Sequence, residues 1–238
     1  MTPPQTLVLP EDGDWRVRVV PNLYPALDRQ EVVVQSPRHV RSVADLGEEE
    51  LDLVAEAWRR RRAAEPQGYL HASVNEGREA GASLPHSHSQ LAWLPFAPPP
   101  EPAFEDGEVV LRRDGLVVRC PTLSRLPYEA AIAPEEPERD GFETELLGPA
   151  LRLLADVVRR LHALEGPVPL NAWLHNVGGW RLVLLPRLTV LASLELGAGV
   201  FINTLPPEDA ARRLREAEPL RREPPVGGSR ERVGADRP

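Results

Sequence analysis

The chain has 238 residues, of which 42% are hydrophobic, and a formal net charge of −8. It is long enough for one large domain or two small ones sharing a core, and no apolar run reaches the roughly 18 residues of a membrane span. The negative charge disfavours a general nucleic-acid surface. The only cysteine, Cys120, excludes an intrachain disulfide and a cysteine-rich zinc site. The first residues resemble neither a signal peptide nor a transit peptide, so we expect a cytoplasmic protein.

The first half of the chain predicts strands crossed by one long helix. Apolar residues alternate with others in WRVRVV, as in a strand with one buried face, and EVVVQSPRH follows. We expect a helix from about Asp45 to Ala64, then strands in GYLHASVNEG and PHSHSQLAWLP. The proline-rich segment from Pro95 to Glu108 lacks backbone donors for a sheet, which is typical of a connector.

The second half runs through the same order of elements. GLVVRCPTLSRLPYEAAIAP precedes a helix expected from about Glu143 to Leu164, and strands follow in PLNAWLHN and GWRLVLLPR. Apolar residues of this helix recur every three or four positions, which gives it one apolar face: Leu146, Leu147, Ala150, Leu151, Leu154, Val157, Val158 and Leu161. We therefore predict an α+β fold with an internal repeat. Residues 218–238 are rich in Gly, Pro and Arg, and we expect them to be disordered.

The segment PHSHSQ holds two of the six histidines of the chain. In an extended segment His86, His88 and Gln90 point from one face. They have three interpretations. A zinc ion would need three or four ligands, and His39 is a third candidate, but no fourth ligand is evident. The histidines could instead be structural, with their nitrogens bonded to backbone carbonyls.

The third interpretation is a nucleophile. Imidazole can attack the α-phosphorus of a nucleoside diphosphate ester and form a covalent intermediate. The attacking nitrogen of His88 must be unprotonated, so the other nitrogen should donate to a fixed acceptor, and we expect a main-chain carbonyl of the same strand. Gln90 can donate to a phosphate oxygen, and small residues upstream, among them Gly81 and Ser83, let the backbone approach phosphate. Because glutamine does no acid–base work, the leaving group should already be a good one, which favours transfer between phosphates over hydrolysis.

Several segments occur together in the order of one known family. VVPNLYPAL, QSPRH, NEGREAGASLPHSHSQ, LPYEAAIAP, NAWLH, LLPRL and ELGAGVFIN followed by PPEDAARRL cover roughly residues 2–216. On these segments the chain resembles the galactose-1-phosphate uridylyltransferase branch of the histidine-triad superfamily. The resemblance implies two histidine-triad-like halves, residues 1–98 and 99–217, each an antiparallel sheet with a long helix, packed as an internal pseudo-dimer. Only the first half carries the catalytic histidine, so we expect one active site per chain.

The resemblance also implies roles for individual residues. His88 matches the nucleophile that becomes nucleotidylated, and Gln90 matches the glutamine that binds the phosphoryl oxygens. Matches to substrate-binding positions are Asn22 beside the base, Asn75 and Ser83 at the ribose and phosphates, with Gly81 in the same loop, and Glu195 near the hexose phosphate. Each of these has a plainer alternative, as a turn residue, a loop hydrogen-bonding residue or a solvated carboxylate.

Metal ligands of the family are incomplete in this chain. In many relatives two cysteines upstream of TPPQ bind zinc with two histidines that match His39 and His86, and those cysteines are missing here. A second metal site in some relatives matches His175, but Gly179 and Arg181 replace its other histidines. We therefore expect no metal in the chain as it stands, and zinc only if a Cys-x-x-Cys segment precedes Met1. His175 is then predicted to be structural.

The predicted function is nucleotidyl transfer, with UMP moving between sugar 1-phosphates as in the exchange of UDP-glucose with galactose 1-phosphate. One alternative is an adenylyl-type transferase or phosphorylase acting on ADP-sugars or dinucleoside polyphosphates. Another is a catalytically silent nucleotide-binding protein, because the metal ligands are incomplete. The expected partners are a nucleotide sugar and a sugar 1-phosphate, without nucleic acid or membrane, and the resemblance suggests a homodimer.

Overall fold

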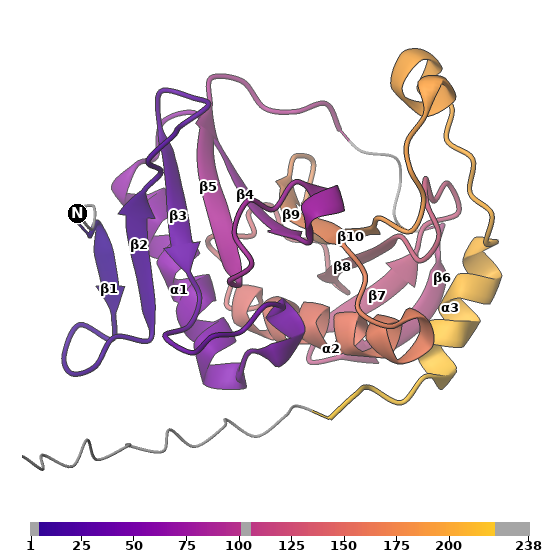
Figure 1. Ribbon diagram of the computed structural model, residues 1–238, viewed down its shortest axis with the longest axis horizontal. Helices are drawn as coiled ribbons and strands as arrows, with labels where there is room; N and C mark the ends of the chain where they lie inside the picture. The colour runs from indigo at the N-terminus through magenta and orange to yellow at the C-terminus, as the bar shows by residue number, and fades with distance from the viewer. Residues whose placement is uncertain (1–4, 101–105, 222–238) are drawn as a thin grey trace, which may run out of the picture.

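A computed structural model describes residues 5–100 and 106–221 (Figure 1). The strands are β1 Leu7–Leu9, β2 Val17–Pro21, β3 Gln30–Val34, β4 Tyr69–Glu76, β5 His88–Leu94, β6 Glu108–Arg113, β7 Leu116–Cys120, β8 Ala130–Pro134, β9 Leu170–Asn176 and β10 Trp180–Pro186. The helices are α1 Glu48–Ala64, α2 Leu147–Glu165 and α3 Pro207–Glu216, with short helical turns η1 Val43–Asp45, η2 Arg78–Ala80 and η3 Leu194–Ala198. This is the α+β class predicted from the sequence.

The strands form one antiparallel sheet in the order β1-β2-β3-β5-β4-β9-β10-β8-β7-β6. At its centre β4 pairs with β9, and Ser73 lies opposite Trp173. Outward from this pair, the strands of the first half follow as β5, β3, β2 and β1, and those of the second half follow as β10, β8, β7 and β6. The long helix of each half, α1 or α2, lies between the third and fourth strands of that half along the chain.

The helices cover one face of the sheet, and the other face carries His88 and Gln90. Helices α1 and α2 pack against each other, α1 lies against β2, α2 against β8 and β10, and α3 against β6 and β7 (Figure 1). Alternate strand residues, such as Ala72, Leu91 and Leu182, are fully buried beneath them. Their neighbours in sequence point from the opposite face, which we call the open face.

The helix boundaries differ from the predicted ones at the amino-terminal ends. The helix expected from Asp45 begins at Glu48, because a separate 3₁₀ turn with Ser42 as its cap precedes it. The helix expected from Glu143 begins at Leu147, and its predicted apolar face is buried. The strand expected over PHSHSQLAWLP begins only at His88, so His86 lies before the sheet rather than in it. None of the helices in the described ranges is long and apolar enough to cross a membrane.

The proline-rich connector and the tail fall partly outside the described residues. Residues 95–100 and 106–107 form no helix or strand, as predicted, while 101–105 are not described. Of the tail expected to be disordered, residues 218–221 have no regular structure and 222–238 lie outside the described residues.

Candidate active site

His88 is the first residue of β5, between β3 and β4 in the first half of the sheet. It lies opposite Val34 of β3, and its side chain is only 5% exposed. Two residues further on, Gln90 lies opposite Val32 on one side and Ser73 on the other. His88 and Gln90 therefore share the open face of the sheet, as the alternation in PHSHSQ predicted.

The ring of His88 is fixed by the backbone. Its Nδ1 lies 2.8 Å from the carbonyl oxygen of His86. A carbonyl oxygen only accepts, so Nδ1 carries the proton in this contact and Nε2 of the neutral ring is left with its lone pair. The main-chain acceptor predicted for His88 is thus present, although His86 belongs to the segment before the strand.

The two serines beside His88 make buried hydrogen bonds on the core side of the segment. Ser89 is fully buried, and its Oγ accepts a hydrogen bond of 2.9 Å from Nε1 of Trp58 in α1. The Ser87 hydroxyl donates to Oε1 of Gln35 at 2.7 Å, and the Ser87 amide donates to the carbonyl of Val40. The two serines of PHSHSQ therefore hold the backbone on both sides of His88.

Gln30 connects Gln90 with the loop that follows β2. The Gln30 amide nitrogen donates to Oε1 of Gln90, and its own Oε1 accepts from the amide of Ala26 at 2.9 Å. The bond engages the carbonyl oxygen of Gln90 and not its amide nitrogen. Sequence analysis missed Gln30, because nothing in QEVVV distinguishes this glutamine until β3 pairs with β5.

Asn22 lies in the same loop and makes a turn. Its side-chain Oδ1 accepts from the backbone amide of Tyr24 at 3.0 Å. Its backbone amide donates to the carbonyl of Gln30. The side chain of Asn22 therefore acts here as a turn residue, the alternative to a role beside the base. Its backbone still links the loop that carries the exposed side chains Leu23 and Tyr24 to Gln30.

Asn75 lies on the open face near the other predicted substrate-binding residues. Its Oδ1 accepts from Nδ2 of Asn171 at 2.8 Å, and the same nitrogen donates to the carbonyl of Ala80. This ties the loop containing Gly81 and Ser83 to the central strands β4 and β9. Gly81 has a φ of +85° and is exposed, as is Ser83, so the loop backbone is open to a ligand.

Glu195 lies apart from these residues. It belongs to η3, in the segment that projects beyond the sheet in Figure 1. Its carboxylate accepts from the amide of Ala192 at 2.9 Å, and backbone hydrogen bonds, this one foremost, lower its pKa. Within one chain the structure does not bring Glu195 together with His88.

His39 and His86 lie together, as the matched zinc positions would require. Their ring centroids are 5.7 Å apart, and the rings meet edge to face. Structural zinc takes four ligands. Across residues 5–100 and 106–221 no group of three or more His, Cys, Asp or Glu side chains is placed to hold a metal, so these residues do not fit a complete site.

Comparisons with known proteins support the resemblance seen in the sequence. Residues 25–98, which include PHSHSQ, match the family model described as galactose-1-phosphate uridyl transferase, N-terminal domain. An ADP-glucose phosphorylase from Arabidopsis thaliana is 26% identical over 90% of this chain and 78% of its own length. A galactose-1-phosphate uridylyltransferase from Thermotoga maritima is 26% identical over 79% of this chain and 74% of its own. These matches support the resemblance to the galactose-1-phosphate uridylyltransferase family, whose model covers residues 25–98.

The fold of the chain has a solved counterpart. The structure of an Arabidopsis thaliana ADP-glucose phosphorylase with bound ADP-glucose superposes with a TM-score of 0.83 and 23% identity, covering 91% of this chain and 87% of that one. At this identity the likeness shows the fold.

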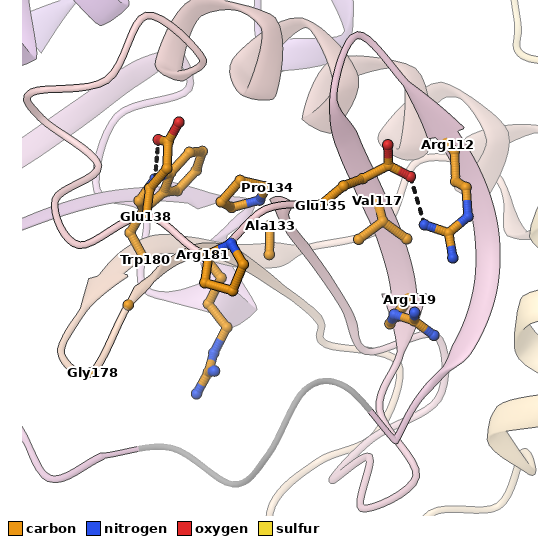
Figure 2. A pocket seen from close by; sticks show the side chains of 12 residues that line it. Arg112, Val117, Arg119, Ala133, Pro134, Glu135, Glu138, Gly178, Trp180 and Arg181 are labelled. Carbon is orange, nitrogen blue, oxygen red and sulfur yellow. Dashed lines mark hydrogen bonds and ion pairs between the residues drawn. The ribbon is translucent and has the colours of Figure 1, made fainter.

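The second half of the chain has a cavity of its own (Figure 2). It has a volume of about 150 Å³ and lies over β7, β8 and β10, with Arg112, Arg119, Glu135, Gly179, Trp180 and Arg181 among its lining residues. Both carboxylates in it have partners, since Glu135 pairs with Arg112 at 2.6 Å and Glu138 accepts from Nε1 of Trp180 at 3.0 Å. Among the described residues that line it there is no histidine, so it offers no counterpart of His88.

Proposed function

We propose that this protein moves a nucleoside monophosphate between phosphate acceptors through a covalent intermediate on His88. The observation that carries the proposal is the contact between His88 Nδ1 and the His86 carbonyl. It presents Nε2 as the free nucleophile, and the carbonyl can stabilise the positive ring that forms when Nε2 bonds to phosphorus.

In the first step Nε2 of His88 attacks the α-phosphorus of a nucleotide sugar. A bond between nitrogen and phosphorus forms, the bond from the α-phosphorus to the bridging oxygen breaks, and sugar 1-phosphate leaves with that oxygen. A sugar 1-phosphate is stable as an anion, so no general acid is required at the position of Gln90. The amide nitrogen of Gln90, which the bond with Gln30 leaves unengaged, is suited to donate to a phosphoryl oxygen as negative charge develops there.

In the second step a phosphate oxygen of the acceptor attacks the nucleotidyl group and releases His88. With UDP-glucose as donor and galactose 1-phosphate as acceptor, the products are glucose 1-phosphate and UDP-galactose. The second candidate is ADP-glucose with inorganic phosphate, which would yield glucose 1-phosphate and ADP. The similarity to the Arabidopsis thaliana ADP-glucose phosphorylase over 90% of this chain favours testing it on equal terms.

The chain's strand order supports an internal repeat as the origin of this site. We infer that residues 1–98 and 99–217 are two histidine-triad-like halves packed as a pseudo-dimer about β4 and β9. The matching strand orders and the equivalent positions of α1 and α2 support this inference. In the second half Arg181 of β10 and Gly179, just before that strand, line the cavity, which supports a single nucleophile per chain.

The test is a pair of exchange reactions with labelled acceptors. We expect label from galactose 1-phosphate to enter UDP-galactose, or label from inorganic phosphate to enter ADP, and we expect His88→Asn to abolish either reaction. His162→Gln is the matched control, because His162 lies on α2, away from the open face. Thermal stabilisation of the wild type by UDP-glucose or ADP-glucose without either exchange would contradict the proposal and identify a silent nucleotide-binding protein.

A further inference from the structure

A second cavity lies on the open face where the two halves of the sheet meet. It has a volume of about 370 Å³. His71 of β4 and Trp173 and His175 of β9 line it, and Arg125 and the residues Pro98–Pro100 of the connector complete the lining. We call it the proline-lined cavity.

His175 lines this cavity and carries a buried nitrogen without a hydrogen-bond partner in the described part of the chain. The side chain is 2% exposed and is hydrogen-bonded to the backbone of Val177, while its Nε2 is buried without a hydrogen-bond partner among the described residues. The hydrogen bond with the Val177 backbone acts to raise the pKa of His175, as it does when a ring nitrogen donates to a carbonyl. That nitrogen is Nδ1, because Nε2 has no partner. Nε2 of the neutral ring is then a lone-pair acceptor, and leaving such a group buried and unpaired is unfavourable.

His71 lies next to His175 on the same face. Ser73 is opposite Trp173, so His71 and His175, two positions further along their antiparallel strands, are neighbours across the sheet. Burial, and then the neighbouring His175, lower the pKa of His71, and burial followed by Arg181 lowers the pKa of His175.

The charges around the two rings disfavour a bound metal. Arg181 lies opposite His175 on β10, and Arg125 lines the cavity itself. A divalent cation would face both guanidinium groups and, among the described residues, would find only two ligating side chains. A ligand that donates a hydrogen bond without carrying positive charge avoids this repulsion.

The remaining walls suit the carbon face of a ring. Trp173 and the three prolines present apolar surface, and the Arg125 guanidinium lies 5.5 Å from the centre of the Trp173 ring. Glu129 binds the same guanidinium at 2.9 Å and 2.5 Å, which balances its charge. The cavity therefore combines acceptors, a neutralised donor group and apolar walls.

We propose that the proline-lined cavity binds an uncharged, hydroxyl-rich ring such as a pyranose sugar, at a site separate from His88. A sugar hydroxyl would donate to Nε2 of His175, other hydroxyls would meet His71 and Arg125, and the C–H faces of the ring would pack on Trp173 and the prolines. His71 lies opposite Ala92, two residues beyond Gln90 on β5, so the cavity borders the candidate active site without containing it. The proposal does not depend on the chemistry of His88.

Histidine-resolved NMR of the whole chain tests the proposal. The Cε1–Hε1 signals of the six histidines are followed while D-glucose or D-galactose is added, since neither sugar carries a phosphate for the active site. We expect saturable shifts of the His71 and His175 signals with a dissociation constant in the millimolar range, and smaller shifts for His39, His86 and His88. Absence of a saturable shift, or shifts confined to His86 and His88, would overturn the proposal.

Two variants make the assignment specific. His175→Phe keeps a ring but removes the acceptor, and we expect about fivefold weaker sugar binding, as for one lost neutral hydrogen bond. His71→Gln is the second variant if His175→Phe does not fold, with the same expected direction, and His162→Gln is the control. Unchanged affinity in a folded His175→Phe, or preference for adenosine over the sugars, would contradict the proposal. His88→Asn should bind the sugars normally, so failure of the transferase chemistry leaves this result independent.

Discussion

At the scale of single residues, one backbone contact gives the two histidines of PHSHSQ different surroundings. The carbonyl of His86 fixes the ring of His88, and the ring of His86 packs against His39. From sequence alone both histidines were candidates for metal, packing or attack. The resemblance to the family separated them, and in the structure the His86 carbonyl just before β5 gives the two rings different partners.

Gln30 is predicted to act by positioning Gln90. Replacing it in Gln30→Leu removes the donor that holds the Gln90 carbonyl oxygen, and we expect kcat/KM of the exchange reaction to fall about fivefold, the effect of one neutral hydrogen bond. The control is Gln67→Leu, since Gln67 is exposed after α1. Steady-state kinetics of both variants check this, and equal rates in Gln30→Leu and wild type would exclude a positioning role.

At the scale of elements, polar contacts to α1 and to the residue after it hold β5 in place. Trp58→Phe removes the bond from α1 to Ser89 and leaves a buried hydroxyl without that donor, so we expect a loss of about 1–3 kcal/mol in the free energy of unfolding. Trp93→Phe removes the hydrogen bond from Trp93 to the carbonyl of Glu65. Because this position is half-buried, we expect a smaller loss in the free energy of unfolding. Urea denaturation measures both, and an equal loss in the two variants would argue against the Ser89 contact.

Glu76, at the end of β4, predicts a pH-dependent stability. Burial raises its pKa from 4.5 to about 7, against the opposing bond from the Val43 amide. A carboxyl whose pKa is raised on folding stabilises the fold fully below its unfolded pKa, and this contribution is lost as the pH rises through the folded value. Between about pH 5 and pH 8 we expect the wild type to lose up to about 3 kcal/mol relative to Glu76→Gln. Parallel pH dependence of the two proteins in urea denaturation would refute this.

Local patterns predicted most elements, and pairing between distant strands accounts for what they missed. The spacing of Leu151, Leu154 and Val158 is enough to predict the buried face of α2, because that pattern lies within one helix. Gln30 could not be recognised, since its role exists only where β3 meets β5. The same holds for His71 and His175, which become neighbours only because β4 pairs with β9 across the two halves.

At the scale of the whole molecule, the projecting segment around η3 is the feature that one chain does not explain. Val190, Leu196, Val200 and Ile202 are more than half exposed there, which is unusual for a group of apolar residues in a monomer. We expect the segment to pack on a second copy of the chain. Light scattering should give the mass of two 26.4 kDa chains, and Leu196→Asp combined with Val200→Asp should give the mass of one. A wild-type protein that remains monomeric at all concentrations would contradict this.

The most direct test of the account is the mass of the protein after incubation with a donor and no acceptor. With UDP-glucose or ADP-glucose we expect the wild type to gain the mass of one uridylyl or adenylyl group, located by peptide mapping on His88 and removed by acid. His88→Asn should gain nothing, and His162→Gln should behave as the wild type does. An adduct on any other residue, or product formation by a wild type that never carries one, would contradict attack by His88.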